Sequence, residues 1–229
     1  MYPDKKKTAA IILAGGSGTR MGMGVTKQRL ELLGKSLLYR SALAFSECPD
    51  IDSITVVVRS DEVDYAKEEL RDIEKLYSVV IGGETRAKSA ECGFLAIPKD
   101  CDFVAIHDAA RPLIKPSDIS LILASAREAG AASAVSCVAD TVKAVDEMGM
   151  IISTVDRDKL RCAETPQVFS VALYKRALIQ NDGAAVTDDN MLIERLGEPI
   201  RCVDLGGYNI KITTPIDLKY AEFLLTNGG

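Results

Sequence analysis

Near its N-terminus the chain runs Ala9-Ala10-Ile11-Ile12-Leu13-Ala14-Gly15-Gly16-Ser17-Gly18-Thr19-Arg20-Met21, and Lys27 follows shortly after. The aliphatic half predicts a buried parallel strand, and the glycines let backbone N–H groups approach a ligand without obstruction by a Cβ atom. Arg20 can bind a phosphate through two N–H groups, whereas Lys27 supplies a mobile point charge. A simple tight connection after a strand would need the glycines but not the two cations. We therefore expect this segment to hold a polyphosphate.

The segment matches neither of the two common phosphate-binding motifs. The Walker motif ends in Gly-Lys-Ser/Thr, whereas Lys27 is followed by Gln28 and lies nine residues beyond Gly18. The dinucleotide motif Gly-x-Gly-x-x-Gly would need a third glycine where this chain has Met21. The segment thus predicts a phosphate site of another kind.

Composition narrows the class of protein. The 229 residues are 47% hydrophobic, which suffices for a packed core, and the net charge of -5 disfavours nucleic acid as a partner. No apolar stretch reaches membrane-spanning length and the N-terminus lacks a signal-peptide segment, so we expect no membrane partner. The six cysteines lack C-x-x-C spacing and His107 is the only histidine, so zinc is not expected. Reduced thiols indicate a cytoplasmic location.

Strand-like and helix-like segments alternate through the first half of the chain. After the strand at residues 9–13, we expect strands at residues 54–58, 78–81, 103–106 and 134–138, and helices at residues 36–46, 61–76, 86–97 and 116–130. This alternation predicts an α/β fold, a Rossmann-like, mainly parallel sheet with helices on both faces. Ligands of such sheets bind at the carboxyl ends of the strands, where residues 15–20, Gly82-Gly83 and His107-Asp108 are expected to converge.

The alternation breaks at about residues 138–156. Two short β-type segments, 141–145 and 150–154, flank Asp146-Glu147-Met148-Gly149 and predict a β-hairpin. Because a lone hairpin buries little, we expect it to project as an arm that packs against a second subunit, with packing on its own sheet as the alternative. Residues 209–213 are expected to form a strand, and Thr214, Pro215 and Asp217 to begin a final helix. We expect one domain over residues 1–229.

Several ordered blocks of the sequence are similar to a known family. The chain resembles the 2-C-methyl-D-erythritol 4-phosphate cytidylyltransferases of the non-mevalonate isoprenoid pathway, which have the nucleotide-diphospho-sugar transferase fold. The resemblance rests on blocks at residues 13–21, 27–28, 82–89, 107–112, 140–143, 154–157, 165–169, 186–189 and 209–213. The chain departs from the family's common pattern in having Ala14-Gly15-Gly16 in place of Ala-Ala-Gly, and Thr26 in place of Pro before Lys27.

The resemblance implies a reaction and a role for each site residue. A phosphate oxygen of the acceptor attacks the α-phosphorus of CTP and pyrophosphate leaves, with Arg20 and Lys27 as the catalytic cations and Mg²⁺ bridging the phosphates. The implied nucleotide-binding residues are Ala14, Gly15, Gly16, Ser17, Gly18, Gly83 and Ser89. The implied acceptor-binding residues are Asp108, Arg111, Thr141, Arg157 and Lys211, with Asp108 also a possible metal ligand. Thr141 and Arg157 would complete the site of the neighbouring subunit of a homodimer.

Other interpretations of these residues stay open. Asp108 and Arg111 could form a local ion pair, Lys211 could be the solvent side of a strand, and Arg157 could belong to a solvated turn. Asp188 and Asp189 could be N-terminal charges of a helix that runs to Leu196, and His107 is expected to be a buried structural histidine. Alternatives to the implied function are ribitol-5-phosphate cytidylyl transfer, another sugar-phosphate nucleotidyl transfer with UTP or GTP, and a non-catalytic nucleotide-binding module.

Overall fold

The computed structural model describes residues 6–16, 26, 29–181, 183 and 185–227. Its strands are β1 (Thr8–Leu13), β2 (Glu31–Leu32), β3 (Lys35–Ser36), β4 (Ser53–Val58), β5 (Leu76–Ile81), β6 (Phe103–Asp108), β7 (Ala131–Cys137), β8 (Val142–Val145), β9 (Ile151–Val155), β10 (Arg161–Ser170) and β11 (Arg201–Asp204). Its α-helices are α1 (Leu37–Glu47), α2 (Val63–Glu69), α3 (Arg86–Leu95), α4 (Pro116–Ala129), α5 (Val171–Gln180), α6 (Asn190–Glu194) and α7 (Pro215–Asn227). Short 3-10 turns lie at Ser60–Glu62 and Arg157–Lys159.

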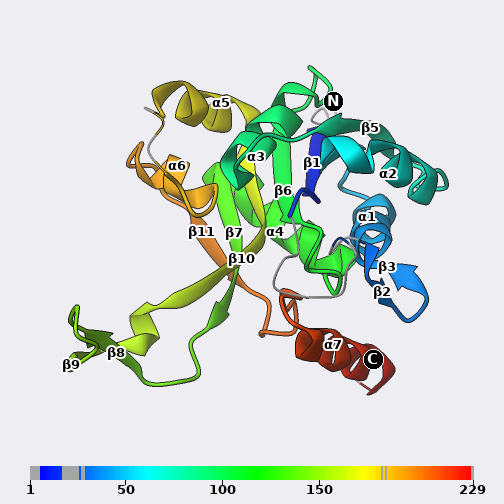
Figure 1. The fold of residues 1–229 in the computed structure, drawn as a ribbon. Coiled ribbons are helices and arrows are strands. Elements are labelled where there is room, and N and C mark those ends of the chain that lie inside the picture. The colour runs from blue at the N-terminus through cyan, green and yellow to red at the C-terminus, as the bar shows by residue number, and fades with distance from the viewer. Residues whose placement is uncertain (1–5, 17–25, 27–28, 182, 184, 228–229) are drawn as a thin grey trace.

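A seven-stranded sheet forms the centre of the molecule, in the order β11-β7-β10-β6-β1-β4-β5 (Figure 1). Neighbouring strands are parallel except β10, which runs antiparallel to both β6 and β7. The mainly parallel sheet expected from the sequence is confirmed. The antiparallel insertion of β10 was not predicted.

Side chains of β1 alternate between two apolar cores, one on each face of the sheet. Ala10 and Ile12 pack with residues of α1, α2 and α4, whereas Ile11 and Leu13 pack with residues of α3, α5 and α6. Helices therefore cover both faces, as predicted. Helix α3 approaches the sheet closely because Gly93 has no side chain: a Cβ atom there would lie 2.5 Å from Ile11 Cγ2.

The arm is a separate two-stranded sheet of β8 and β9, and it extends away from the central sheet (Figure 1). The turn between its strands is held by Asp146, whose Oδ1 accepts hydrogen bonds from the backbone N–H groups of Met148 and Met150, and Gly149 takes a φ of 80°. Met148, Ile151 and Ile152 are 88%, 66% and 67% exposed. The hairpin is thus confirmed as a projecting element, and packing on its own sheet is excluded.

Two expected elements are wrong. Residues 209–213 form no strand; the alternating pattern there is a loop in which Ile212 donates one backbone hydrogen bond to Ala110. The helix expected at residues 61–76 ends at Glu69, because turns closed by Ile73 and Leu76 N–H groups redirect the chain into β5. The buried positions Leu70 and Ile73 keep a helical spacing within those turns, which explains the error.

Candidate active site

The carboxyl ends of β1, β4 and β5 meet at a set of small residues. The N–H group of Ala14 donates to the carbonyl of Val57, which ties the first glycine segment to β4. A Cβ atom on Gly15 would meet Ser89 Oγ at 3.9 Å, and one on Gly82 would meet the same oxygen at 2.6 Å. Gly15, Gly82 and Ser89 therefore lie together, although they come from distant parts of the chain. This close approach requires glycine at position 82.

The start of α3 shapes the same region. Thr85 caps the helix by accepting a hydrogen bond from Lys88 N–H, and the Ser89 hydroxyl contacts the carbonyl oxygens of Gly83 and Thr85. A Cβ atom on Gly83 would lie 2.3 Å from Lys88 Cγ, so a larger residue here would clash with the first turn of α3. The structure thus brings together the predicted nucleotide-binding residues that it describes: Ala14, Gly15, Gly83 and Ser89. Gly16 follows Gly15 and is exposed.

We call Gly15, Gly82, Gly83 and Ser89 the glycine cradle. Beside it, Asp108 at the end of β6 binds two cations. Its Oδ1 accepts a hydrogen bond from Arg86 Nε at 3.1 Å, and its Oδ2 lies 2.5 Å from Lys211 Nζ. Burial acts to raise the pKa of Asp108, but the charges of Arg86 and Lys211 outweigh it and hold that pKa well below its usual range. Asp108 is therefore a carboxylate. The sequence-based alternative of an Asp108–Arg111 ion pair is wrong.

Arg86 extends this cluster to a second carboxylate. Its Nη1 donates to Asp189 Oδ2 at 2.6 Å, and Asp189 Oδ1 accepts a hydrogen bond from the buried Tyr174 hydroxyl at 2.6 Å. Burial alone would lower the pKa of Arg86, yet Asp189 and Asp108 raise it above its usual range. Two carboxylates and two cations then cancel, so the cluster of Arg86, Asp108, Asp189 and Lys211 is neutral.

Sequence reasoning missed Arg86 and Asp189. Arg86 lies in the 82–89 block that resembles the family, at the first position of a helix that follows a strand end. A cation at this place in the sequence could have indicated a site residue. Asp189 was interpreted as a possible helix charge, but in the structure Asp188 binds the N–H group of Met191 and Asp189 turns to Arg86.

Arg111 lies near Asp108 but binds elsewhere. Its Nη1 donates to the Asn209 carbonyl at 2.7 Å, and its guanidinium lies 3.7 Å from Glu164. Arg111 thereby fastens the loop that carries Lys211 to β10. Lys211 is not the solvent side of a strand, because its ammonium faces Asp108.

His107 is a buried structural residue, as expected. It has no exposed surface, its Nδ1 contacts the Thr165 hydroxyl at 3.1 Å and its Nε2 contacts the Arg111 carbonyl at 3.1 Å. Because the Arg111 carbonyl can only accept, Nε2 carries the imidazole proton and donates to it, and the neutral ring's Nδ1 accepts from the Thr165 hydroxyl. Burial lowers the pKa of His107 to about 4. At neutral pH it is uncharged.

Two further predicted site residues that the structure describes lie outside this region. Thr141 and Arg157 are exposed residues of the arm, where Arg157 donates to the Ala139 carbonyl. Ser17, Gly18, Arg20 and Lys27 fall outside the described residues.

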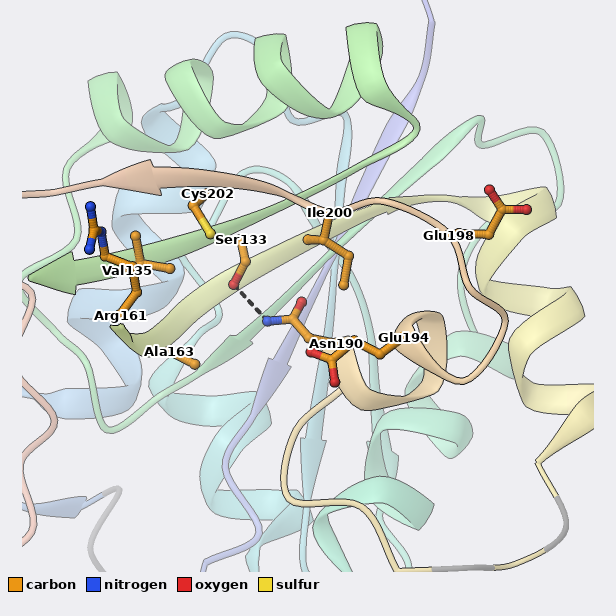
Figure 2. Close-up of a pocket in the computed structure, with 9 residues that line it drawn as sticks. All are labelled: Ser133, Val135, Arg161, Ala163, Asn190, Glu194, Glu198, Ile200 and Cys202. Atoms are coloured by element: carbon orange, nitrogen blue, oxygen red, sulfur yellow. Dashed lines mark hydrogen bonds between the residues drawn. The ribbon is translucent and has the colours of Figure 1, made fainter. Parts of the chain in front are cut away.

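A separate pocket of about 320 Å³ lies between α6 and the strands at the other edge of the sheet (Figure 2). Figure 2 shows the hydrogen bond that Asn190 Nδ2 donates to Ser133 Oγ at 2.8 Å within it. The residues that line it are Ser133, Val135, Arg161, Ala163, Asn190, Glu194, Glu198, Ile200 and Cys202. None of the predicted site residues is among them, so this pocket is distinct from the glycine cradle and the Asp108 cluster.

Comparison with known proteins decides the family. The family model described as "IspD: 2-C-methyl-D-erythritol 4-phosphate cytidylyltransferase" matches residues 8–227. The chain belongs to this family. A cytidylyltransferase of this name from Desulforamulus reducens is 40% identical over 221 residues, covering 94% of each chain. One from Endomicrobium trichonymphae is 41% identical over 219 residues, covering 96% of this chain and 99% of the relative.

Solved structures agree with the family assignment. The 4-diphosphocytidyl-2C-methyl-D-erythritol synthase from Anaerococcus prevotii superposes with a TM-score of 0.87 at 29% identity and covers 98% of each chain. The 2-C-methyl-D-erythritol 4-phosphate cytidylyltransferase from Thermus thermophilus gives a TM-score of 0.77 at 29% identity, covering 96% of this chain and 99% of that one. The predicted family, α/β fold and nucleotidyltransferase class are confirmed. Among the described residues of this IspD family member, no helix is long and apolar enough to cross a membrane.

Proposed function

We propose that this chain transfers the cytidylyl group of CTP to the phosphate of 2-C-methyl-D-erythritol 4-phosphate and releases pyrophosphate, as a step of non-mevalonate isoprenoid precursor biosynthesis. The observation that carries this proposal is the family match over residues 8–227. The glycine cradle beside the Asp108 cluster supports it, because two anionic substrates must meet at one place. Ribitol 5-phosphate as the acceptor is not favoured by these relatives.

The acceptor phosphate needs no general base. A phosphate monoester has its second pKa at about 6, so its oxygens are already mostly ionised at neutral pH. The chain offers no histidine for this task, since its only histidine, His107, is neutral, buried and hydrogen-bonded through both ring nitrogens. The protein therefore has to position the two substrates and neutralise the negative charge of their phosphates.

Because the cluster is neutral, we assign acceptor binding and triphosphate binding to different residues. Lys211 is 42% exposed and can donate to the acceptor phosphate, while Asp108 can accept from an acceptor hydroxyl. Since the charges of Arg86 and Lys211 are already balanced by Asp108 and Asp189, the cluster supplies no excess positive charge for a triphosphate. We assign that charge to Arg20 and Lys27, with the backbone of Gly15, Gly16, Ser17 and Gly18 around the phosphates.

Magnesium fits this arrangement as an ion held mainly by substrate phosphates. The described residues contain no group of three or more His, Cys, Asp or Glu that could hold a metal ion. Asp108 is a carboxylate that faces the partly exposed Lys211, and Mg²⁺ is commonly bound through one or two carboxylates and phosphate oxygens. When bound, the ion would neutralise charge on the α-phosphoryl oxygens.

The arm is proposed to join two subunits into a homodimer. The exposed apolar residues Met148, Ile151 and Ile152 support this proposal, because a water-exposed hairpin of this kind is marginal without a partner. Thr141 and Arg157 would then contribute to the neighbouring subunit's acceptor site. The six free cysteines support a reducing compartment, the cytoplasm, as the place of action.

The experiment is a pyrophosphate-release assay with Mg²⁺ and each pairing of CTP, UTP, GTP or ATP with 2-C-methyl-D-erythritol 4-phosphate or ribitol 5-phosphate. The proposal expects turnover with CTP and methylerythritol phosphate. Turnover with ribitol 5-phosphate alone would assign the sister activity, and a purine nucleotide preference would reject cytidylyl transfer.

A further inference from the structure

The ion-pair cluster is a continuous series of contacts that runs from the apolar core to solvent. It begins at the buried Asp189, passes through Arg86 and Asp108, and ends at the ammonium of Lys211, whose side chain is 42% exposed. Arg86 joins the two carboxylates, since its Nε donates to Asp108 and its Nη1 donates to Asp189. Its Nη2 is buried and has no hydrogen-bond partner within the described part of the chain. The guanidinium is therefore held between the carboxylates although one buried donor is left unpaired, which is unfavourable.

The inner end of this series is fixed on two sides. Asp189 Oδ1 accepts a hydrogen bond from the Tyr174 hydroxyl at 2.6 Å, and the Asp189 N–H group donates to Gln167 Oε1 at 2.9 Å. Tyr174 has no exposed surface and Gln167 is buried, so both partners belong to the packed interior. Arg86 is itself the first residue of α3, which fixes its backbone. The Arg86 guanidinium thus has a set position, and it can impose that position on Asp108.

The outer end depends on these contacts. Lys211 lies in a loop, and its Nζ pairs with Asp108 Oδ2 alone among the described residues. The other oxygen of the Asp108 carboxylate, Oδ1, accepts from Arg86. Because Arg86 holds one oxygen of the carboxylate, the second oxygen is presented to Lys211 in one direction. The place of the Lys211 ammonium therefore follows from the place of Arg86.

The charge of Arg86 has a consequence for the binding of an anion. With Arg86 present, the two carboxylates are balanced by two cations. Without that charge, Asp108 and Asp189 would face the single ammonium of Lys211, and the cluster would be negative. A negative cluster repels a phosphate dianion and holds the ammonium more strongly on Asp108. An ion pair that served stability alone would have no such selective effect on an anionic ligand.

We propose that Arg86 is a positioning residue for the acceptor phosphate, acting through Asp108 on the ammonium of Lys211. This inference rests on the proposed function, in which Lys211 donates to that phosphate. Arginine suits this role because its planar fork presents separate N–H groups to two carboxylates. A lysine ammonium at the same position would be a point charge on a flexible stem and would not fix both carboxylates.

The test compares Arg86→Lys, which keeps the charge but loses the fork, with Arg86→Gln, which loses both. Steady-state kinetics give kcat and the KM for 2-C-methyl-D-erythritol 4-phosphate, and calorimetry gives the Kd for CTP with Mg²⁺. We expect Arg86→Lys to raise the acceptor KM about tenfold and Arg86→Gln to raise it further, while the Kd for CTP stays within about twofold. A merely structural role would disturb the start of α3, where the proposed nucleotide-binding residues Gly83 and Ser89 lie, and would weaken CTP binding as well.

A double-mutant cycle with Lys211→Ala tests the route of action. In the Lys211→Ala background, Arg86→Lys should raise the acceptor KM no further. Arg71→Lys is the matched control, because Arg71 also pairs with two carboxylates, Glu68 and Asp72, but at the exposed surface. It should leave kcat, the acceptor KM and the Kd for CTP within about twofold of the wild-type values.

Three results would overturn the proposal: a folded Arg86→Lys enzyme with an unchanged acceptor KM, equal rises in the two backgrounds, or a parallel loss of CTP binding. If Arg86→Lys does not fold, Tyr174→Phe replaces it, since it removes only the hydroxyl that holds Asp189. The acceptor KM should then rise, and an unchanged value would overturn the proposal.

The proposed function can fail separately. If the wild-type enzyme shows no turnover, that function is rejected, and calorimetric titration of 2-C-methyl-D-erythritol 4-phosphate with CTP and Mg²⁺ present decides the role of Arg86. Weaker binding by Arg86→Lys than by the wild-type protein would support the positioning role. Equal Kd values, or no binding by the wild-type protein, would overturn it.

Discussion

Replacing Asp189 with asparagine should destabilise the folded protein far more than an exposed Asp→Asn change. The Asp189 side chain is 1% exposed and accepts hydrogen bonds from Arg86 Nη1 and the Tyr174 hydroxyl, both at 2.6 Å. Asparagine keeps the shape but removes the charge, and its amide group must face one of these donors. Arg86 then retains a single carboxylate partner, Asp108.

The magnitude follows from the contacts that are lost. A hydrogen bond to a charged group contributes about 1.5–3 kcal/mol, and removing one partner of a buried ion pair costs about 3–5 kcal/mol. Because Arg86 keeps Asp108 and is 27% exposed, we expect a loss near the lower end, about 3 kcal/mol in the free energy of unfolding. For a chain of this size, that corresponds to a fall in Tm of about 6–12 °C.

Urea unfolding followed by circular dichroism measures the change, with Asp72→Asn as the control. Asp72 is 76% exposed and lies 3.7 Å from Arg71, so its replacement should change the free energy of unfolding by less than about 0.5 kcal/mol. If Asp189→Asn matched Asp72→Asn, the ion-pair cluster would contribute nothing to the fold, and the reasoning from its burial would be refuted.

Three further predictions concern His107, Gly93 and the arm. Burial lowers the pKa of His107 to about 4, so on acidification the unfolded chain takes up a proton before the folded one. The free energy of unfolding should therefore fall by up to about 1.4 kcal/mol per pH unit between about pH 6.5 and about pH 4. NMR of this single histidine should show a neutral ring down to about pH 4, and titration near pH 6.5 would contradict its burial. Gly93→Ala should lower the free energy of unfolding by about 1–3 kcal/mol, because its Cβ would lie 2.5 Å from Ile11 and 2.8 Å from Val57; an unchanged urea midpoint would argue against the close packing of α3. Ile151→Glu should convert a dimer to a monomer in analytical ultracentrifugation, and a wild-type monomer, or a dimer that the variant leaves intact, would reject the arm as the interface.

The elements that the sequence predicted well are those with strong local patterns. The aliphatic run of β1 and the acidic turn with Gly149 between β8 and β9 each determine a local structure, so their places were predictable. Likewise, Gly130 ends α4 with a φ of 87°, a conformation that favours glycine.

The errors arose where a local pattern has more than one structural solution. Ile210, Lys211 and Ile212 alternate as in a strand, but the apolar pair packs in a small apolar cluster with residues such as Leu32 and Leu113, while Lys211 turns to Asp108. The pairing of Arg86 with Asp189 joins residues 103 positions apart in the chain, and no periodicity encodes such a contact. The cluster's charge balance could therefore be found only in the folded molecule.

We propose that nucleotide and acceptor meet between the glycine cradle and the Asp108 cluster. A crystal structure with CTP, Mg²⁺ and the acceptor analogue 2-C-methyl-D-erythritol tests it directly. We predict the cytidine against Gly83 and Ser89, and the polyol beside Asp108 and Lys211. A nucleotide bound instead in the pocket of Ser133 and Asn190, with the cradle empty, would show that the two substrates do not meet there.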